Sequence, residues 1–541
     1  MLGDSLWTGM TIESSGCIER DRALYSETVP RFDPLSRALG AVAALLGTGA
    51  AAVYWWASLS LSHYDAKAHL VVARRILDSL TPSWEQIGAL WLPLPHVLNA
   101  LPVQIDWMYQ TGASAILISI VSFAITVASL SALVMRVTGS AWGAGLAAAI
   151  FAANPNVLYL QSTPMTEPLL FALSSLVVLH LAEWALSEVV PVRRAAGWTI
   201  VAACLTRYEA WPIIGGAMVL AAWVKWRRGT PMRQVVASTA RLACYPVGAV
   251  LFFMGMSFAS IGEWFVTGGF YVPDPKLRGQ PLVVLEAILE GVAHLGGPRL
   301  VLAATVSAAV LLVAALTSKQ EIRRSGVISF QRIAPELLAS CKTHPAALVM
   351  PLALLASAAL PFYAFVSGHP FRIRYEVPLI LGCAACIGAS VGLARRAAPA
   401  VAVILFAAIV VQARPFDRHA PMIVEAQLDR QNGIGRQAVT ACLRHSYDGT
   451  TVMASMAALA HYMQELSLAG FHLADFLHEG SGPTWQAAYA NGPVAFTGWV
   501  LIEEAAEGGD RLHQKATQWP EFLRGFERVC EGGNVALYKR R

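Results

Sequence analysis

Charge is scarce in this chain, and its scarcity excludes an ordinary soluble protein. Only 14% of the 541 residues are charged, 56% are hydrophobic, and the mean hydropathy is +0.51. Soluble domains carry about 25% charged residues. The net charge of +5 is small, and the basic residues lie in short runs between apolar segments, so nothing indicates nucleic-acid binding. Lipid is therefore the expected main solvent of the chain.

Metal-ligand spacing, a secretory leader and internal repeats are also lacking. Cys383 and Cys386 form a CxxC pair inside an apolar run with no histidine beside it, which indicates packing. Cys442 and Cys530 are the two cysteines of the polar tail, and whether they form a disulfide stays open. Residues 1–37 mix acids and bases without an apolar core, so we expect a cytoplasmic N-terminal segment. The absence of a repeat argues against an inverted-repeat transporter.

Apolar runs dominate the rest of the chain. An uncharged helix of about 20 residues crosses the hydrocarbon core. The runs predict about eleven transmembrane helices. The pair meeting at Arg207 is short and predicts a broken helix. The expected spans are 38–60, 112–135, 141–160, 168–187, 197–209, 211–227, 240–260, 298–316, 346–367, 375–391 and 397–413.

Basic residues predict the orientation of these spans. Arg136, Arg193, Lys225, Lys319 and Arg395, with their basic neighbours, fall in alternate connections, which the positive-inside rule places in the cytoplasm. The tail then lies on the extracytoplasmic side. We expect a cytoplasmic segment 1–37, a transmembrane catalytic domain 38–413 and an extracytoplasmic, periplasmic domain 414–541 of a multi-pass inner (plasma) membrane protein.

The tail mixes two kinds of pattern. Residues 454–466 read as a helix, whereas 494–496, 499–502 and 535–538 are short apolar runs typical of strands. The fold class is therefore a polytopic α-helical membrane protein with a small C-terminal α/β domain.

Two acids stand next to predicted spans on the extracytoplasmic side. If 63–77 is helical, Asp65 and His69 share one face at a spacing of four residues. A carboxylate beside a low-dielectric wall has its charged form disfavoured, which predicts a raised pKa for Asp65 and a better proton acceptor. Glu167 precedes Pro168 at the start of the next span. Helix capping is the competing interpretation for both acids.

Cations lie on the same predicted side. Arg207 stands at the broken pair, and Arg372 and Arg374 come directly before a span, with Tyr375 following. Arginine at a membrane is usually paired or lines a polar cavity, and its guanidinium fork suits phosphate oxygens. An anionic ligand explains two closely spaced arginines better than snorkelling does.

Taken in order, these motifs resemble the GT-C class of membrane glycosyltransferases. The families most similar are the protein O-mannosyltransferases and the bacterial lipid A aminoarabinose transferases. The resemblance covers about 38–413 in topology, and a C-terminal extracytoplasmic domain fits some members. The residues that carry it are Tyr64-Asp65 after the first span, His69 in the following helix, Thr166-Glu167-Pro168, Leu205-Thr206-Arg207 and Arg374-Tyr375.

This resemblance implies roles for the residues. Asp65 would be the general base, Glu167 would assist it, and Arg374 with Arg372 would bind the lipid phosphate. Arg207, Tyr375 and His69 would belong to the substrate site. Many members have an Asp-Glu pair in the first loop, whereas Ala66 follows Asp65 here. The subfamily and the sugar are therefore left open.

The implied reaction is an inverting transfer of a sugar from a polyprenyl-phosphate donor to a hydroxyl of a glycan, lipid or protein. The lipid bilayer is the other expected partner. No cofactor is required, and a divalent cation is neither demanded nor indicated. A transporter or flippase for a lipid-linked or anionic substrate is the main alternative, but it predicts charges inside several spans. A scaffold subunit, in which the acids have no chemical role, is the third interpretation.

Overall fold

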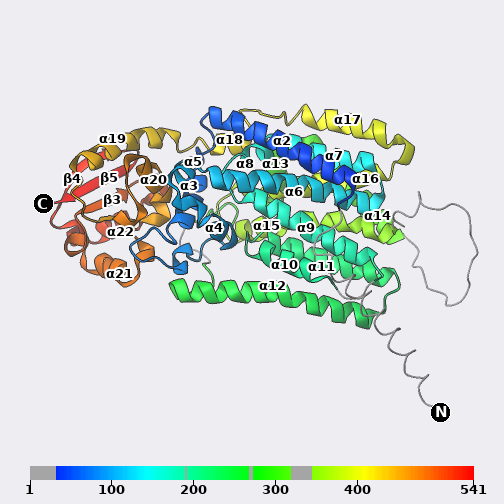
Figure 1. Ribbon diagram of the computed structural model, residues 1–541, viewed down its shortest axis with the longest axis horizontal. Coiled ribbons are helices and arrows are strands. Elements are labelled where there is room, and N and C mark those ends of the chain that lie inside the picture. Colours follow the sequence, from blue (N-terminus) through cyan, green and yellow to red (C-terminus); the bar gives the residue numbers. More distant parts are fainter. Residues whose placement is uncertain (1–31, 189–191, 267–271, 318–343) are drawn as a thin grey trace, which may run out of the picture.

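The computed structural model describes residues 32–188, 192–266, 272–317 and 344–541. Figure 1 shows a long helical bundle with a mixed sheet and its helices at one end. Most of the predicted N-terminal segment, residues 1–31, lies outside the described residues. The architecture agrees with the predicted fold class, a polytopic helical membrane protein with a small C-terminal sheet domain.

Seven described segments are helical, long and apolar enough to cross a membrane. Each overlaps an apolar run predicted as a span, because uncharged runs of this length satisfy their backbone only as helices in lipid. The total of eleven spans stays a prediction. The seven are α2 (Pro34–Trp56), α6 (Ala113–Thr138), α9 (Glu167–Leu186), α12 (Met232–Ile261), α14 (Pro298–Thr317), η3 with α15 (Pro345–Ala358 and Ala359–Val366) and η4 with α16 (Ile373–Glu376 and Val377–Gly392).

Shorter helices complete the bundle. The predicted break at Arg207 separates two of them, and a helix lies at 281–296, where we expected only a connection. Glu286 and Glu290 interrupt the apolar run there, so no uncharged run predicted this helix. These helices are α7 (Ala141–Ala153), α8 (Pro155–Leu160), α10 (Arg194–Cys204), α11 (Ala210–Arg227), α13 (Pro281–Gly296) and α17 (Ala398–Val410).

The polar stretch between α2 and α6 folds into short helices beside the sheet (Figure 1). The first, α3 (Tyr64–Arg74), begins eight residues after α2 ends. Next come η1 (Trp84–Ile87), α4 (Leu94–Asn99), η2 (Pro102–Gln104) and α5 (Asp106–Thr111). This layer separates the bundle from the C-terminal sheet.

The sheet has five strands in the order β2-β1-β3-β5-β4. β1 pairs in parallel with β2 and β3, while β5 pairs antiparallel with β3 and β4. The predicted strands at 499–502 and 535–538 are present, but 494–496 is wrong. Pro493 and the positive φ of Gly492 begin a 3-10 turn there instead. The strands are β1 (Val452–Ala454), β2 (Phe476–Leu477), β3 (Trp499–Glu503), β4 (Phe526–Gly532) and β5 (Val535–Arg540).

Helices cover both faces of this sheet. One face shares a buried cluster with α19 (Arg430–Ser446) and α20 (Met456–Leu466), and the other packs on α21 (Gly482–Asn491) and α22 (Arg511–Gln518). Leu70 and Val71 of α3 belong to the first cluster. The core of the sheet domain thus continues into the helix that carries Asp65.

Cys442 on α19 and Cys530 on β4 form a disulfide, which settles the alternative left open by the sequence. The bond joins residues 88 positions apart, with Cα atoms separated by 6.6 Å. Closing a loop of this length restricts the unfolded chain and stabilises the domain by about 2–4 kcal/mol.

We therefore expect Cys442→Ser with Cys530→Ser to lower the unfolding temperature of the sheet domain by several degrees. The exposed free cysteine Cys244 supplies the control, Cys244→Ser. Tryptophan fluorescence during heating, with and without reductant, measures both. Equal unfolding temperatures in the wild type and the double variant would show that the bond does not stabilise the fold.

Candidate active site

Five charged side chains meet at the end of the bundle that faces the sheet domain. Arg374 contacts Asp65 and places Nε 3.5 Å from Glu167 Oε1. Arg207 places one terminal nitrogen 2.9 Å from the same Glu167 oxygen and the other 2.6 Å from Glu209 Oε1. The charges alternate in the order Asp65, Arg374, Glu167, Arg207, Glu209. This ion-pair chain joins four segments that are far apart in the sequence.

Local structure places both predicted acids where the backbone favours negative charge. Asp65 is the second residue of α3, and the Asp65 backbone N–H donates to Nδ1 of the capping residue His63 at 3.1 Å. Glu167 is the first residue of α9 and precedes Pro168. A helix N-terminus carries partial positive charge, which stabilises a carboxylate. The capping positions considered for these acids are therefore real, and the same residues also join the ion-pair chain.

Breaks in the helices bring the two arginines to these acids. Arg207 lies in the gap between α10 and α11, where its terminal nitrogen also donates to Thr166 Oγ1 at 2.9 Å. Arg374 lies in η4, the short 3-10 turn that precedes α16. A continuous helix would aim these side chains along its own surface. The interruptions instead direct both guanidinium groups towards Glu167.

Burial makes these charges depend on one another. Asp65 is 8% exposed, Glu209 3% and Glu167 fully buried. Burial alone raises the pKa of the Asp65 carboxyl, but the charge of Arg374, helped by His63 and His69, outweighs burial and holds that pKa below its usual range. The predicted rise in the Asp65 pKa is therefore wrong for this arrangement. The sequence alone did not show that a cation 309 positions away contacts the acid.

Part of this site keeps unused hydrogen-bonding capacity. Among the described residues, neither carboxylate oxygen of Glu167 nor Nε of Arg374 has a hydrogen-bond partner, although each lies within ion-pair distance of an opposite charge. Unpaired polar atoms in a buried position are unfavourable. The carboxylate oxygens of Glu167 and Nε of Arg374 are therefore the atoms best placed to bind a polar ligand.

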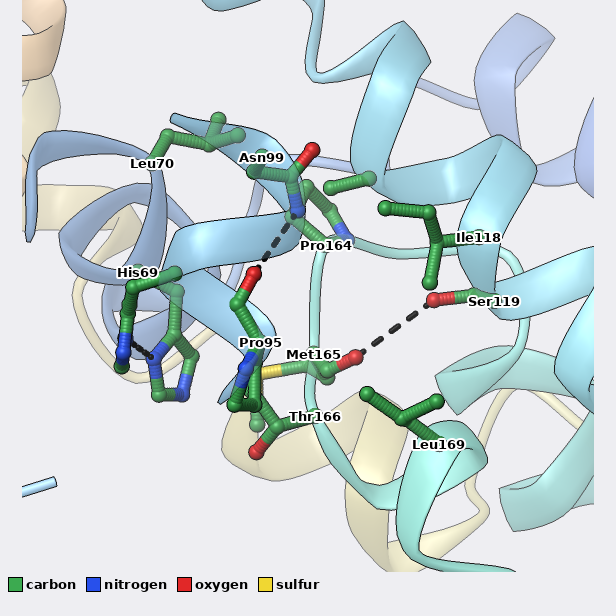
Figure 2. A pocket seen from close by; sticks show the side chains of 12 residues that line it. His69, Leu70, Pro95, Asn99, Ile118, Ser119, Pro164, Met165, Thr166 and Leu169 are labelled. Atoms are coloured by element: carbon green, nitrogen blue, oxygen red, sulfur yellow. Dashed lines mark hydrogen bonds between the residues drawn. The ribbon is translucent and has the colours of Figure 1, made fainter. Parts of the chain in front are cut away.

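His69 lies one turn beyond Asp65 on α3. Its Nδ1 is 3.1 Å from Nε2 of His96 on α4, the contact drawn in Figure 2. Both rings border a small cavity of about 20 Å³, which Asn99, Ser119 and Thr166 also line. This volume suits one water molecule rather than a sugar.

Two predicted residues lie beside the ion-pair chain rather than in it. The Tyr375 hydroxyl is 3.5 Å from His369 Nε2, and the Tyr375 ring is 6.0 Å from the Arg374 guanidinium carbon. Arg372 lies near enough to Tyr64 to lower the pKa of that phenol, although Asp65 and burial raise it overall. These residues border the site on the side of the 3-10 turn.

The sequence did not predict a second ion pair, which lies close to Asp65. His63 Nε2 lies 3.6 Å from Oε1 of Glu425, which ends the short helix α18 (Pro421–Glu425) leading into the sheet domain. Burial raises the pKa of Glu425, but His63 and Arg374 lower it overall. The Glu425 carboxylate comes from the predicted C-terminal domain, and no spacing motif announces it.

A wide cleft is lined by the segment that follows α2, by residues of α3 and α5, and by residues of α19 and α20. Its volume is about 1040 Å³, large enough for an extended polar ligand. Amide, hydroxyl and basic side chains line it, among them Lys67, Gln110, Arg430, Gln437, Thr440, Arg444, His445 and Gln464. Lys67 lies two residues beyond Asp65, so the cleft adjoins the helix that carries the predicted base.

Ion pairs also fasten α3 to the sheet domain. Lys67 Nζ is 2.6 Å from Oε1 of Glu465 on α20. The same oxygen lies 2.8 Å from Arg436, which is 2.6 Å from Asp429. Arg436 is almost fully buried, so this network depends on both of its carboxylates. The sheet domain therefore helps to hold the helix that carries Asp65.

No metal site emerges from the described residues. Cys383 and Cys386 are both buried within α16, in the largest apolar cluster. Among the residues that the structure describes, no group of three or more histidine, cysteine, aspartate or glutamate side chains is arranged to hold a metal ion.

Comparison with known proteins shows the fold. No protein-family model matches the chain, and no curated protein matches its sequence. Two crystal structures of ArnT from Cupriavidus metallidurans match 91% of this chain over 97% of their own. The structure bound to undecaprenyl phosphate has a TM-score of 0.52 at 12% identity, and the apo structure 0.54 at 11%. The predicted likeness to the GT-C fold of lipid A aminoarabinose transferases is confirmed.

Replacing Arg374 tests the ion-pair chain. In Arg374→Leu, Asp65 and Glu167 lose a shared cation, which is expected to cost about 3–5 kcal/mol at neutral pH. Without the cation, burial raises the pKa of Asp65, and the loss is relieved as the pH falls through that pKa. In the wild type, the depressed pKa of Asp65 keeps its pairing energy present at any pH above about 4.

The gap in unfolding temperature between the wild type and Arg374→Leu should therefore narrow between pH 8 and pH 5. Tryptophan fluorescence during heating measures it, and Arg396→Leu, at an exposed position, is the control with a constant gap. A gap for Arg374→Leu that does not change with pH would contradict the proposed dependence of the two acids on this cation.

Proposed function

We propose that this chain is an inverting glycosyltransferase that moves a sugar from a polyprenyl-phosphate donor to an acceptor hydroxyl. The observation that carries the proposal is the buried ion-pair chain, which combines two guanidinium groups with two predicted catalytic acids. The shared fold supports it, because ArnT of this fold was crystallised with undecaprenyl phosphate. A protein that draws its donor from the bilayer also explains the long apolar helices.

The donor phosphate takes Arg374 away from Asp65 in this proposal. Phosphate and carboxylate compete for the same guanidinium fork, and a bound phosphate between Arg374 and Arg207 replaces part of the existing pairing. Asp65 then loses the cation that depresses its pKa. The base becomes competent only when the donor is in place, because burial then raises its proton affinity.

The chemical step is one displacement at the anomeric carbon. The acceptor oxygen forms a bond to that carbon from the face opposite the phosphate, and the bond from carbon to the phosphate oxygen breaks. The electron pair leaves with the lipid phosphate, where Arg374 and Arg207 stabilise the developing charge. Asp65 takes the proton of the acceptor hydroxyl, and Glu167 binds a substrate hydroxyl through its unpaired oxygens.

The cleft beside Lys67 is the proposed entry for the acceptor. It is lined by Lys67 of α3, the helix that carries the proposed base, and by polar groups of the sheet domain that bind hydroxyls. The domain 414–541 would contact the acceptor, and 38–413 would hold the donor and the reacting atoms. We place both at the extracytoplasmic face of the inner membrane, with the N-terminus in the cytoplasm, because the basic connections alternate with this face.

The arrangement favours an enzyme over a transporter or flippase. In the described residues, Asp65 and Glu167 lie in the first turns of α3 and α9, Arg374 lies in the 3-10 turn before α16, and Arg207 and Glu209 lie between α10 and α11. A route across the membrane would require such groups at several depths. Chemistry at one surface requires only this cluster.

Transfer of labelled sugar tests the proposal. Purified protein is given a panel of polyprenyl-phosphate sugars with glycan, lipid and peptide acceptors, and wild type is compared with Asp65→Asn. Loss of a general base should lower kcat by about 10²- to 10⁴-fold while donor binding is retained. Asp106→Asn, at an exposed residue on the same side, is the matched control and should transfer normally.

Two results would reject the proposed roles. Transfer that proceeds equally well in Asp65→Asn removes Asp65 as the base. A protein that turns over no donor, with an Asp65→Asn variant indistinguishable from wild type in cells, favours the transporter or the scaffold.

A further inference from the structure

His69 and His96 form a hydrogen-bonded pair, and the partner of each ring nitrogen determines which nitrogen carries the proton. Nδ1 of His96 lies 3.1 Å from the backbone carbonyl oxygen of Leu92, which only accepts hydrogen bonds, so that nitrogen carries a proton. In a neutral ring the other nitrogen, Nε2, is then an acceptor. Its partner, Nδ1 of His69, is 3.1 Å away and must donate. Nε2 of a neutral His69 is left with a free lone pair.

The surroundings keep both rings neutral. His96 is 1% exposed and His69 7%. Burial, together with the charge of Arg75, lowers the pKa of His96 to about 3. Burial and the His96 ring lower the pKa of His69 far below its usual range, and Arg374 and Arg207 add to this effect although Asp65 opposes it. A second positive charge beside two guanidinium groups would be unfavourable.

Packing against Trp91 holds the His69 ring, and with it the lone pair of Nε2, in one orientation. The His69 ring rests against Trp91 with centroids 4.2 Å apart, and Trp91 stacks on His96 at an interplanar angle of 17°. Asp65, one turn earlier on α3, and the two arginines of the ion-pair chain are the charged groups near the His69 ring. Within the described residues, no hydrogen bond occupies Nε2 of His69.

We propose that Nε2 of His69 accepts a hydrogen bond from a hydroxyl of a substrate, and that His96 is a positioning residue that fixes the required tautomer. The inference rests on the proposed function and deepens it. A lone pair repels a phosphate oxygen but suits a hydroxyl, so His69 selects a hydroxyl group rather than the lipid phosphate. That hydroxyl belongs either to the donor sugar or to the acceptor.

The tautomers can be measured without any turnover. Two-bond ¹H–¹⁵N spectra of the purified protein with ¹⁵N-labelled histidine distinguish Nδ1–H from Nε2–H rings. We expect His69 and His96 to be neutral Nδ1–H tautomers at pH 7, assigned by His69→Phe and His96→Leu. In His96→Leu the His69 signal should lose this tautomer, whereas in His96→Gln the amide oxygen can still accept the proton. His472→Phe, at an exposed ring, is the control.

A His69 ring that is protonated on Nε2 at pH 7 would overturn the inference, even if sugar transfer is confirmed. Conversely, absence of transfer would reject the proposed function without changing the spectra.

Kinetics then identify the hydroxyl. His69→Phe should lower kcat/KM by about 10- to 100-fold through loss of one buried hydrogen bond. A loss confined to the donor dependence assigns the hydroxyl to the sugar, and one confined to the acceptor assigns it to the acceptor. His96→Gln should retain most of the activity that His96→Leu loses. Equal kcat/KM for His69→Phe and wild type would contradict the proposal.

Discussion

The site depends on one constraint, which is that its buried charges alternate in sign and pair with one another. Each member of the chain from Asp65 to Glu209 has lost most of its contact with water, and each pairs with an opposite charge, which comes from another segment in every pair except Arg207 with Glu209. Removing one member leaves its neighbours unpaired, which is more unfavourable than losing a surface ion pair. A ligand that carries charge therefore enters by exchanging partners within the chain.

The sheet domain contributes to this constraint from outside the bundle. Its apolar core includes residues of α3, and the pair between Lys67 and Glu465 ties the same helix to α20. Glu425 approaches His63, the residue that caps α3. The helix with the proposed base is thus held between two parts of the molecule. A domain that contacts the acceptor and also holds the base links acceptor binding to the geometry of the reaction.

Much of the bundle was predictable because uncharged runs are local features, and the seven long helices follow them. The break at Arg207 was also visible as two short runs. The helix 281–296 was not predicted because two glutamates interrupt its apolar run, and charged residues are typical of the connections between spans. The contact between Asp65 and Arg374 joins residues 309 positions apart, so its effect on the pKa of Asp65 required the folded structure. The proton arrangement of His69 likewise depends on the carbonyl of Leu92, which no motif contains.

Affinity for undecaprenyl phosphate in wild type and Asp65→Asn tests the central claim most directly. If the phosphate competes with Asp65 for Arg374, neutralising the acid releases the guanidinium group and the variant binds the lipid phosphate more tightly than wild type, although it transfers sugar more slowly. Equal or weaker binding by Asp65→Asn would show that the lipid phosphate does not take Arg374 from Asp65, and the exchange of partners would be contradicted.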